Sequence, residues 1–216
     1  MSLKVRKRPR TSIPPLDDGS YVAICVGIVD LGEQHSKRYN KDQDKIWVAW
    51  EIKDEFVNIE GEEKPRWVSA KYTKSLHENS NLRKALKAWR KRDFTDDELM
   101  DDFDMMTMLG TECMLQVSIY EGDNGPQNDV DGISSLPKGV KVGKPISELF
   151  YFDMDDPDTY GALEKMPKHI AKQVKGSHTW QAMHANSEEM GMDEDEEYDE
   201  SDVDKETGEI NRSASF

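Results

Sequence analysis

The sequence predicts a mainly β domain with several helices, followed by a disordered acidic tail. Three observations support this fold class: five short segments with alternating apolar residues, a helical pattern between the third and the fourth, and a run of acids near the C-terminus. The chain has 216 residues, which is one domain of ordinary size plus an appendage. With 36% hydrophobic and 34% charged residues it is too polar for a single globule, so part of it is expected to stay unpacked.

The five predicted strands place apolar side chains at every second position, which suits a sheet with one buried face. They cover residues 21–31, 45–53, 66–73, 112–120 and 128–136. Residues 35–44 are polar and predict a hairpin loop, and residues 58–64 predict a turn around Gly61. Gly132 interrupts the fifth strand and indicates a bulge there.

Two helices are predicted between the third and fourth strands. The first covers residues 79–92, with Asn79 or Ser80 as its cap and apolar residues at helical spacing. The second begins with the capping pattern Thr95-x-x-Glu98 and extends to about residue 105. Three strands, a helical connection and two further strands match the OB-fold, a five-stranded Greek-key barrel, and a Greek-key sandwich is the alternative.

This pattern divides the chain into four parts. Residues 1–15 form a flexible basic arm, which either neutralises phosphates or is simply a solvated terminus. Residues 16–145 form the OB-fold domain. Residues 146–185 form a C-terminal extension with a helix over 159–174 that Pro167 kinks or splits, and residues 186–216 form the disordered acidic tail.

The distribution of charge leaves room for a basic surface on the folded body. The formal net charge is −15, but residues 187–216 contain 13 acidic and 2 basic residues, a net of −11. The rest of the chain therefore carries only −4, and it can hold basic patches.

Aromatic and basic residues alternate on one predicted sheet face, a pattern typical of proteins that bind single-stranded nucleic acid. Trp47 and Trp67 share a face with Lys71, and we expect this face to be exposed because Lys does not fit a packed one. Exposed tryptophans stack on bases, and the alternative is that both are core residues. Trp50 and Trp89 are expected in the core. The candidate DNA-binding residues are Lys37, Arg38, Tyr39, Trp47, Trp67, Lys71, Lys74, Arg83, Lys87 and Arg90.

The outer face of the first predicted helix is strongly basic. It carries six bases and no acid, whereas solvated faces normally mix both signs. These bases are Arg83, Lys84, Lys87, Arg90, Lys91 and Arg92. The pattern indicates either phosphate contact or a solvated face.

The acidic tail is predicted to act as a polyanion that mimics the ligand. It would occupy the protein's own basic groove when DNA is absent, or contact replication or recombination proteins, with a solubility role as the alternative. The residues concerned are Asp193, Glu194, Asp195, Glu196, Glu197 and the terminal Phe216.

Signals for an enzyme, a cofactor or a membrane segment are weak. Cys25 and Cys113 lie in apolar runs and predict two buried reduced thiols. The five histidines show no metal-ligand spacing, and no phosphate loop or nucleophile elbow is present, so no catalytic residue, metal or cofactor is predicted. No apolar stretch is long enough to span a membrane, and no secretion signal is seen.

Three stretches of the sequence resemble a phage-encoded family of single-stranded-DNA-binding replication proteins. They are PRWVSAKYTKSLHENSNLRKALKAWRKRDFT at residues 65–95, YVAICVGIVDLGEQHSKRYNKDQDKIWVAWEI at residues 21–52 and SLPKG at residues 135–139. The resemblance covers roughly residues 15–145 and implies an OB-fold, binding without sequence preference, and a role in phage DNA replication or recombination in the cytoplasm of the infected bacterium. It marks as family positions Trp67, Lys71, Tyr72, Lys74, Arg83 and Trp89.

The sequence departs from the family in two places. Residues 211–215, none of them acidic, directly precede Phe216, and residues 122–132 are more acidic than expected beside DNA. The alternative function is an acidic DNA mimic that inhibits a host nuclease or repair enzyme, which the net charge favours and the basic clusters disfavour. A metal-dependent nuclease, using acids near residues 101–104 or 153–156, is the third hypothesis.

Overall fold

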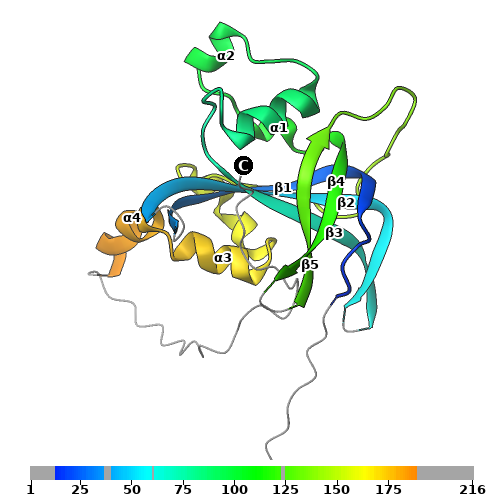
Figure 1. Ribbon diagram of the computed structural model, residues 1–216. Helices are drawn as coiled ribbons and strands as arrows, with labels where there is room; N and C mark the ends of the chain where they lie inside the picture. Colours follow the sequence, from blue (N-terminus) through cyan, green and yellow to red (C-terminus); the bar gives the residue numbers. More distant parts are fainter. Residues whose placement is uncertain (1–12, 37–39, 60, 123–124, 189–216) are drawn as a thin grey trace, which may run out of the picture.

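The computed structural model describes residues 13–36, 40–59, 61–122 and 125–188 (Figure 1). The strands are β1 Gly19–Ser36, β2 Lys41–Ile59, β3 Glu62–Thr73, β4 Glu112–Gly122, β5 Gly125–Ser134 and β6 Phe150–Phe152. The helices are α1 Asn81–Arg90, α2 Asp96–Met100, α3 Lys168–Lys175 and α4 His178–Glu188, with 3₁₀ turns η1 Met105–Met108 and η2 Pro157–Glu164.

The five long strands form one curled antiparallel sheet in the order β3-β2-β1-β4-β5. β1 is the central strand: it pairs with β2 along most of its length, and residues 19–24 pair with β4. Residues 27–29 of β1 then pair in parallel with the short strand β6. The fold is therefore mainly β, as the alternating pattern predicted.

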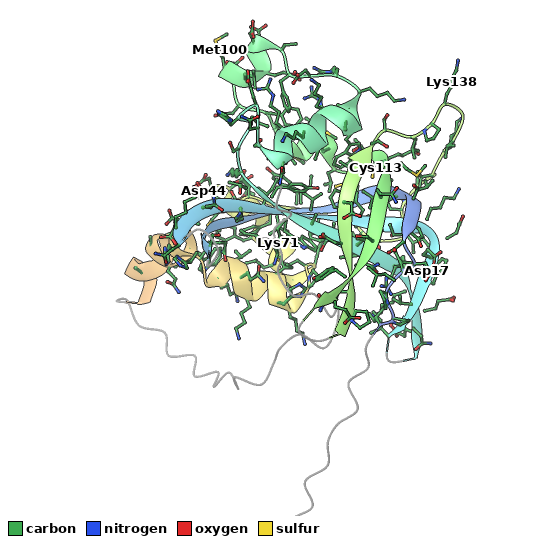
Figure 2. All side chains as sticks on the ribbon, viewed as in Figure 1. Asp17, Asp44, Lys71, Met100, Cys113 and Lys138 are labelled. Atoms are coloured by element: carbon green, nitrogen blue, oxygen red, sulfur yellow. The ribbon has the colours of Figure 1, made fainter. Side chains whose placement is uncertain are left out.

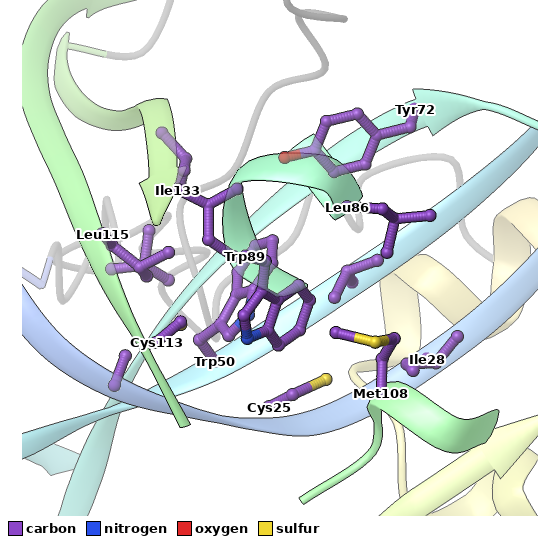
Figure 3. Close-up of a cluster of buried hydrophobic side chains, with 14 of the residues drawn as sticks. Cys25, Ile28, Trp50, Tyr72, Leu86, Trp89, Met108, Cys113, Leu115 and Ile133 are labelled. Carbon is purple, nitrogen blue, oxygen red and sulfur yellow. The ribbon is translucent and has the colours of Figure 1, made fainter. Parts of the chain in front are cut away.

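Helices cover both faces of this sheet, which explains why β1 is buried on both sides. On one face, in the first core, Val48, Trp50 and Ile52 pack against α1, and Trp50 meets Trp89 with ring centroids 5.9 Å apart (Figure 3). On the other face, in the second core, Trp47 and Ala49 pack against β6, η2 and α3. In Figure 1 the pair α1 and α2 lies above the sheet, and α3 and α4 lie below it.

Several sequence predictions are confirmed in detail. Ser80 caps α1 by accepting a hydrogen bond from the Arg83 amide, and Thr95 and Glu98 form the capping box of α2. The register between β4 and β5 shifts after Gln116, opposite Gly132, where the bulge was expected. The thiols of Cys25 and Cys113 are free and buried.

Three element predictions differ from the structure. The predicted turn over 58–64 is too long, since Asn58 pairs with Glu63 and Ile59 with Glu62 in the ladder between β2 and β3. The predicted loop over 35–44 is largely strand, since His35 pairs with Asp42 and Ser36 with Lys41. Polar residues can continue the strands of a hairpin when their partners across the ladder are also polar. A search for alternating apolar residues does not detect such a strand. The second helix stops at Met100 rather than near 105, because Asp102 has a positive φ of 59° that turns the chain.

The C-terminal segment depends on a glycine in β1 for its position. A Cβ atom at Gly27 would lie 2.3 Å from the Phe150 ring, so only glycine lets β6 lie so close to β1. Phe150 thereby reaches the tryptophans of the neighbouring strands. Among the described residues, no helix is long and apolar enough to cross a membrane.

Candidate nucleic-acid interface

α1 presents basic residues on its outer side because its large apolar residues, Leu82, Leu86 and Trp89, are buried in the first core. Lys84 and Lys87 are exposed, whereas the side chains of Arg83 and Arg90 are only 16% and 9% exposed. Leu82, Leu86 and Trp89 follow one another at spacings of four and three, the period of an amphipathic helix. Of the six bases predicted on this face, Lys84, Lys87, Lys91 and Arg92 are exposed.

Acids from the next segment neutralise much of that face, although the helix itself contributes no acid to it. Asp93 accepts hydrogen bonds from Lys87 at 2.8 Å and from Arg83 at 3.3 Å. The bond from Lys87 is the main reason that the pKa of Asp93 falls to about 2. Arg83 and Lys87, both candidate DNA ligands, are thus already occupied by a carboxylate.

Arg90 belongs to the structure of this region rather than to its surface. Its guanidinium pairs with Glu98 and lies 4.6 Å from the ring centroids of both Phe94 and Phe103. Its side chain is only 9% exposed. Arg90 is therefore poorly accessible to a phosphate, which disfavours the prediction that it contacts DNA.

Glu98 also holds Arg92 through two hydrogen bonds of 2.7 and 2.8 Å. This bidentate contact is the main reason that the pKa of Glu98 falls to about 2. Unlike Arg90, Arg92 remains exposed. A phosphate that approached it would have to share the guanidinium with Glu98.

A shallow depression of about 530 Å³ lies beside the outer face of α1. Its lining consists of Lys84, Lys87, Ala88, Lys91, Arg92 and Asp93. We call the four bases of this lining, Lys84, Lys87, Lys91 and Arg92, the α1 basic surface. Four cations around one alanine and one acid make this depression suitable for an anion.

Lys84 and Lys91 are the members of this surface with the greatest freedom to bind an anion. Both are exposed, and no carboxylate of the described residues forms an ion pair with either. Lys91 donates a hydrogen bond to the carbonyl of Leu136 at 3.2 Å. This contact joins the end of α1 to the loop that follows β5.

That loop extends the positive charge beyond α1, which the sequence analysis did not anticipate. Its exposed lysines are Lys138, Lys141 and Lys144, and residues 137–144 contain no acid. Figure 2 shows Lys138 pointing away from the body into solvent. Further along this loop, the Lys53 side chain donates a hydrogen bond to the Lys141 carbonyl at 3.3 Å. The repeated Lys at every third position was the signal available in the sequence.

The predicted stacking pair does not lie on an exposed face. Trp47 is 2% exposed and donates from Nε1 to Ser69, while Trp67 is half-buried and donates to Ser147. Phe150 stacks on both, with centroid distances of 6.1 and 5.8 Å. The prediction of an open stacking face was wrong, because a segment one hundred residues later in the chain covers it.

Lys71 and Lys74 do not join the α1 basic surface. Lys71 donates to Gln173 of α3 at 2.8 Å, which places it on the opposite face of the sheet (Figure 2). Lys74 pairs with the nearly buried Asp30 at 2.5 Å, and this carboxylate raises the pKa of Lys74 against the opposing effect of burial. Both lysines therefore have polar partners away from α1.

The remaining candidates lie outside the described residues. They are Lys37, Arg38 and Tyr39, the basic arm up to residue 12, and the tail residues Asp193, Glu194, Asp195, Glu196, Glu197 and Phe216. The structure therefore adds nothing to the predictions made for them.

α3 carries a second basic row that the sequence analysis overlooked. Lys168, Lys172 and Lys175 are exposed at spacings of four and three, while Ile170 and Val174 point into the second core. The helical spacing of Lys168 and Lys172 was visible within the predicted helix over 159–174, and Lys175 directly follows it. This row lies across the sheet from the α1 basic surface.

Comparison with known proteins adds no functional assignment, so the proposal depends on the residues described above. No family model matches the chain, and the search of curated proteins finds no match.

Proposed function

We propose that this protein binds single-stranded DNA without sequence preference and acts in phage DNA replication or recombination. The observation that carries the proposal is the α1 basic surface, where exposed cations surround a shallow depression. Neutralising backbone phosphates requires such groups and is independent of base sequence. The resemblance of residues 65–95, which include α1, to phage single-stranded-DNA-binding proteins supports the same function.

The order of the strands favours an OB-fold as the scaffold. β1 pairs with both β2 and β4, and the helix α1 stands between β3 and β4 in the chain, as in that fold. The two outer strands approach each other, since Arg66 of β3 donates to Asn128 of β5 at 3.2 Å. α1 spans this gap, where its Ala88 carbonyl accepts from the Ser135 amide at 3.2 Å.

The mode of binding that we propose differs from the one the sequence suggested. Because Trp47, Trp50 and Trp89 are buried, affinity is expected to come mainly from phosphate contacts rather than from tryptophan stacking. The path runs from the α1 basic surface along the loop that carries Lys138 and Lys141. Binding should therefore depend strongly on salt.

The first prediction concerns the double variant Lys84→Gln/Lys91→Gln. We expect it to weaken binding of fluorescein-labelled oligo-dT, measured by fluorescence anisotropy. The slope of log affinity against log salt should fall by about 1.4, at about 0.7 per lost phosphate contact on a single strand. Neither lysine forms an ion pair with a described carboxylate, so the fold should be retained.

A matched control is available on the opposite face of the sheet. The variant Lys168→Gln/Lys172→Gln removes the same charge from α3 and should leave both affinity and salt slope close to the parent values. Equal weakening by both pairs would show that only net charge matters and would reject the α1 basic surface as the binding site.

A specific observation keeps the DNA-mimic function as a second candidate. The β2–β3 hairpin exposes Asp54, Glu62 and Glu63, of which Glu62 pairs with Lys64 at 3.8 Å. A mimic would bind a nuclease and no oligonucleotide. Recovery of such an enzyme by the full chain, with no anisotropy change for oligo-dT at low salt, would select this alternative.

A further inference from the structure

A cluster of potential metal ligands lies where the β1–β2 hairpin meets the start of α4. Nδ1 of His178 is 3.4 Å from Oε2 of Glu33 and 3.8 Å from Oδ2 of Asp42. One ligand atom from each of the three residues lies within 4.8 Å of the other two. All three side chains are exposed, so an ion could reach them from solvent.

The backbone around the cluster is held by contacts that do not involve its ligand atoms. The amide of Glu33 donates to Thr179 Oγ1 at 3.0 Å, and the Gln34 side chain donates to the Gln173 carbonyl at 3.1 Å. The buried Ser177 accepts from the Trp180 amide and anchors the first turn of α4. His178 therefore faces the hairpin before any ion binds.

The separations fit a tetrahedral ion. Zn²⁺ binds nitrogen and oxygen ligands at about 2.0–2.2 Å, which sets neighbouring ligand atoms about 3.3–3.6 Å apart. The distances from His178 lie at or just above this range. Water is the natural fourth ligand, since the cluster faces solvent. One imidazole and two carboxylates are donors that divalent transition metals accept.

His35 supplies the outer contact that ligating carboxylates usually have. Its Nδ1 lies 2.8 Å from Oδ1 of Asp42, so it holds one carboxylate oxygen while the other faces His178. The two histidines are 143 positions apart in the sequence, which is why spacing along the chain gave no metal signal.

We propose that Glu33, Asp42 and His178 bind one divalent cation of the Zn²⁺ class, with His35 orienting Asp42. The ion fastens α4 to the β1–β2 hairpin, and so secures the end of the segment that covers Trp47 and Trp67. An ion here also offsets the repulsion between two neighbouring carboxylates. The proposal does not depend on DNA binding.

The test is calorimetric titration of the full chain with ZnCl₂ after EDTA treatment and desalting. We expect one saturable site whose affinity falls at least tenfold in His178→Gln and in Asp42→Asn. His35→Gln should weaken it about tenfold, the lower end of the effect of an outer partner. The control His77→Gln, an exposed histidine beside α1, should bind as the parent does.

The acidic tail also attracts cations, but none of these substitutions changes it, so its contribution cancels between variants. Equal Zn²⁺ affinity in the parent and His178→Gln would overturn the site. Zn²⁺ should raise the Tm of the parent and not that of His178→Gln, and binding without this rise would overturn the fastening role. Mg²⁺, which prefers six oxygen ligands, should give no comparable rise, and an equal one would overturn the assigned class of ion.

Discussion

Phe150 determines which surface of the sheet is available. It stacks on Trp47 and Trp67, the two tryptophans that the sequence predicted on an exposed face. Phe150 can approach β1 this closely only because Gly27 has no side chain. One aromatic ring and one glycine thus convert an expected ligand face into core.

A prediction at this scale concerns the pair Gly27 and Phe150. Gly27→Ala should destabilise the fold by about 1–3 kcal/mol, because the added methyl group meets the Phe150 ring. Phe150→Ala should cost about 3–5 kcal/mol through the lost packing. Urea unfolding measures both.

The energetic coupling between these two substitutions distinguishes a direct contact from general destabilisation of the fold. In Gly27→Ala/Phe150→Ala the clash is absent, so the double variant should be less destabilised than the sum of the two single variants. Strict additivity would contradict the proposed contact.

Lys91 offers a second test at the residue scale. It ends α1 with a φ of 61°, a conformation that favours glycine. Lys91→Gly should therefore raise stability by about 0.5–1 kcal/mol in thermal unfolding, although it removes a cation from the α1 basic surface. If DNA affinity falls while Tm rises, the loss of binding cannot result from unfolding. A fall in Tm would contradict the inference that Lys91 is strained in its left-handed conformation.

At the scale of elements, α1 and the segment after it form one charged unit. Asp93 and Glu98 bind the bases of α1 and stop them from repelling one another. α1 is therefore fixed by ion pairs on its outer side and by Trp89 on its inner side.

This arrangement predicts acid sensitivity. The pKa values of Asp93 and Glu98 are about 2 in the folded protein, below their ordinary values of 3.8 and 4.5. A lowered pKa contributes stability that is present above the ordinary value and is lost as pH falls toward 2. Stability of the parent should thus decline between about pH 4.5 and 2. In Asp93→Asn/Glu98→Gln the decline should be shallower, and an unchanged profile would contradict the role of these pairs.

Local patterns in the sequence predicted the elements well and their environments less well. Ser80, the Thr95 capping box and the alternation in β2 depend on nearby residues, so the elements appeared at their expected places. The burial of Trp47 depends on Phe150, and the pairing of Lys87 depends on a turn that brings back Asp93. Contacts between different elements, whether distant in the sequence like Trp47 and Phe150 or close like Lys87 and Asp93, leave no periodic trace in a single sequence.

At the scale of the whole molecule, charge is divided between the body and the tail. Removing residues 189–216 takes away 12 acids and 2 bases while leaving α4 complete. If the tail competes for the basic surface, its removal should raise affinity for oligo-dT in the anisotropy assay, most of all at low salt. Unchanged or weaker binding would reject competition and favour a role for the tail in contacting other proteins.

The parallel pairing of β6 with β1 also has a consequence for synthesis. β1 leaves the ribosome early, whereas β6 and α3 follow more than one hundred residues later. Until they emerge, the side of the sheet that holds Trp47 and Val29 has nothing to cover it. Nascent chains, and fragments that stop at residue 145, should therefore aggregate or recruit chaperones. The domain boundary at residue 145 suggested by the strand pattern would thus give an insoluble product.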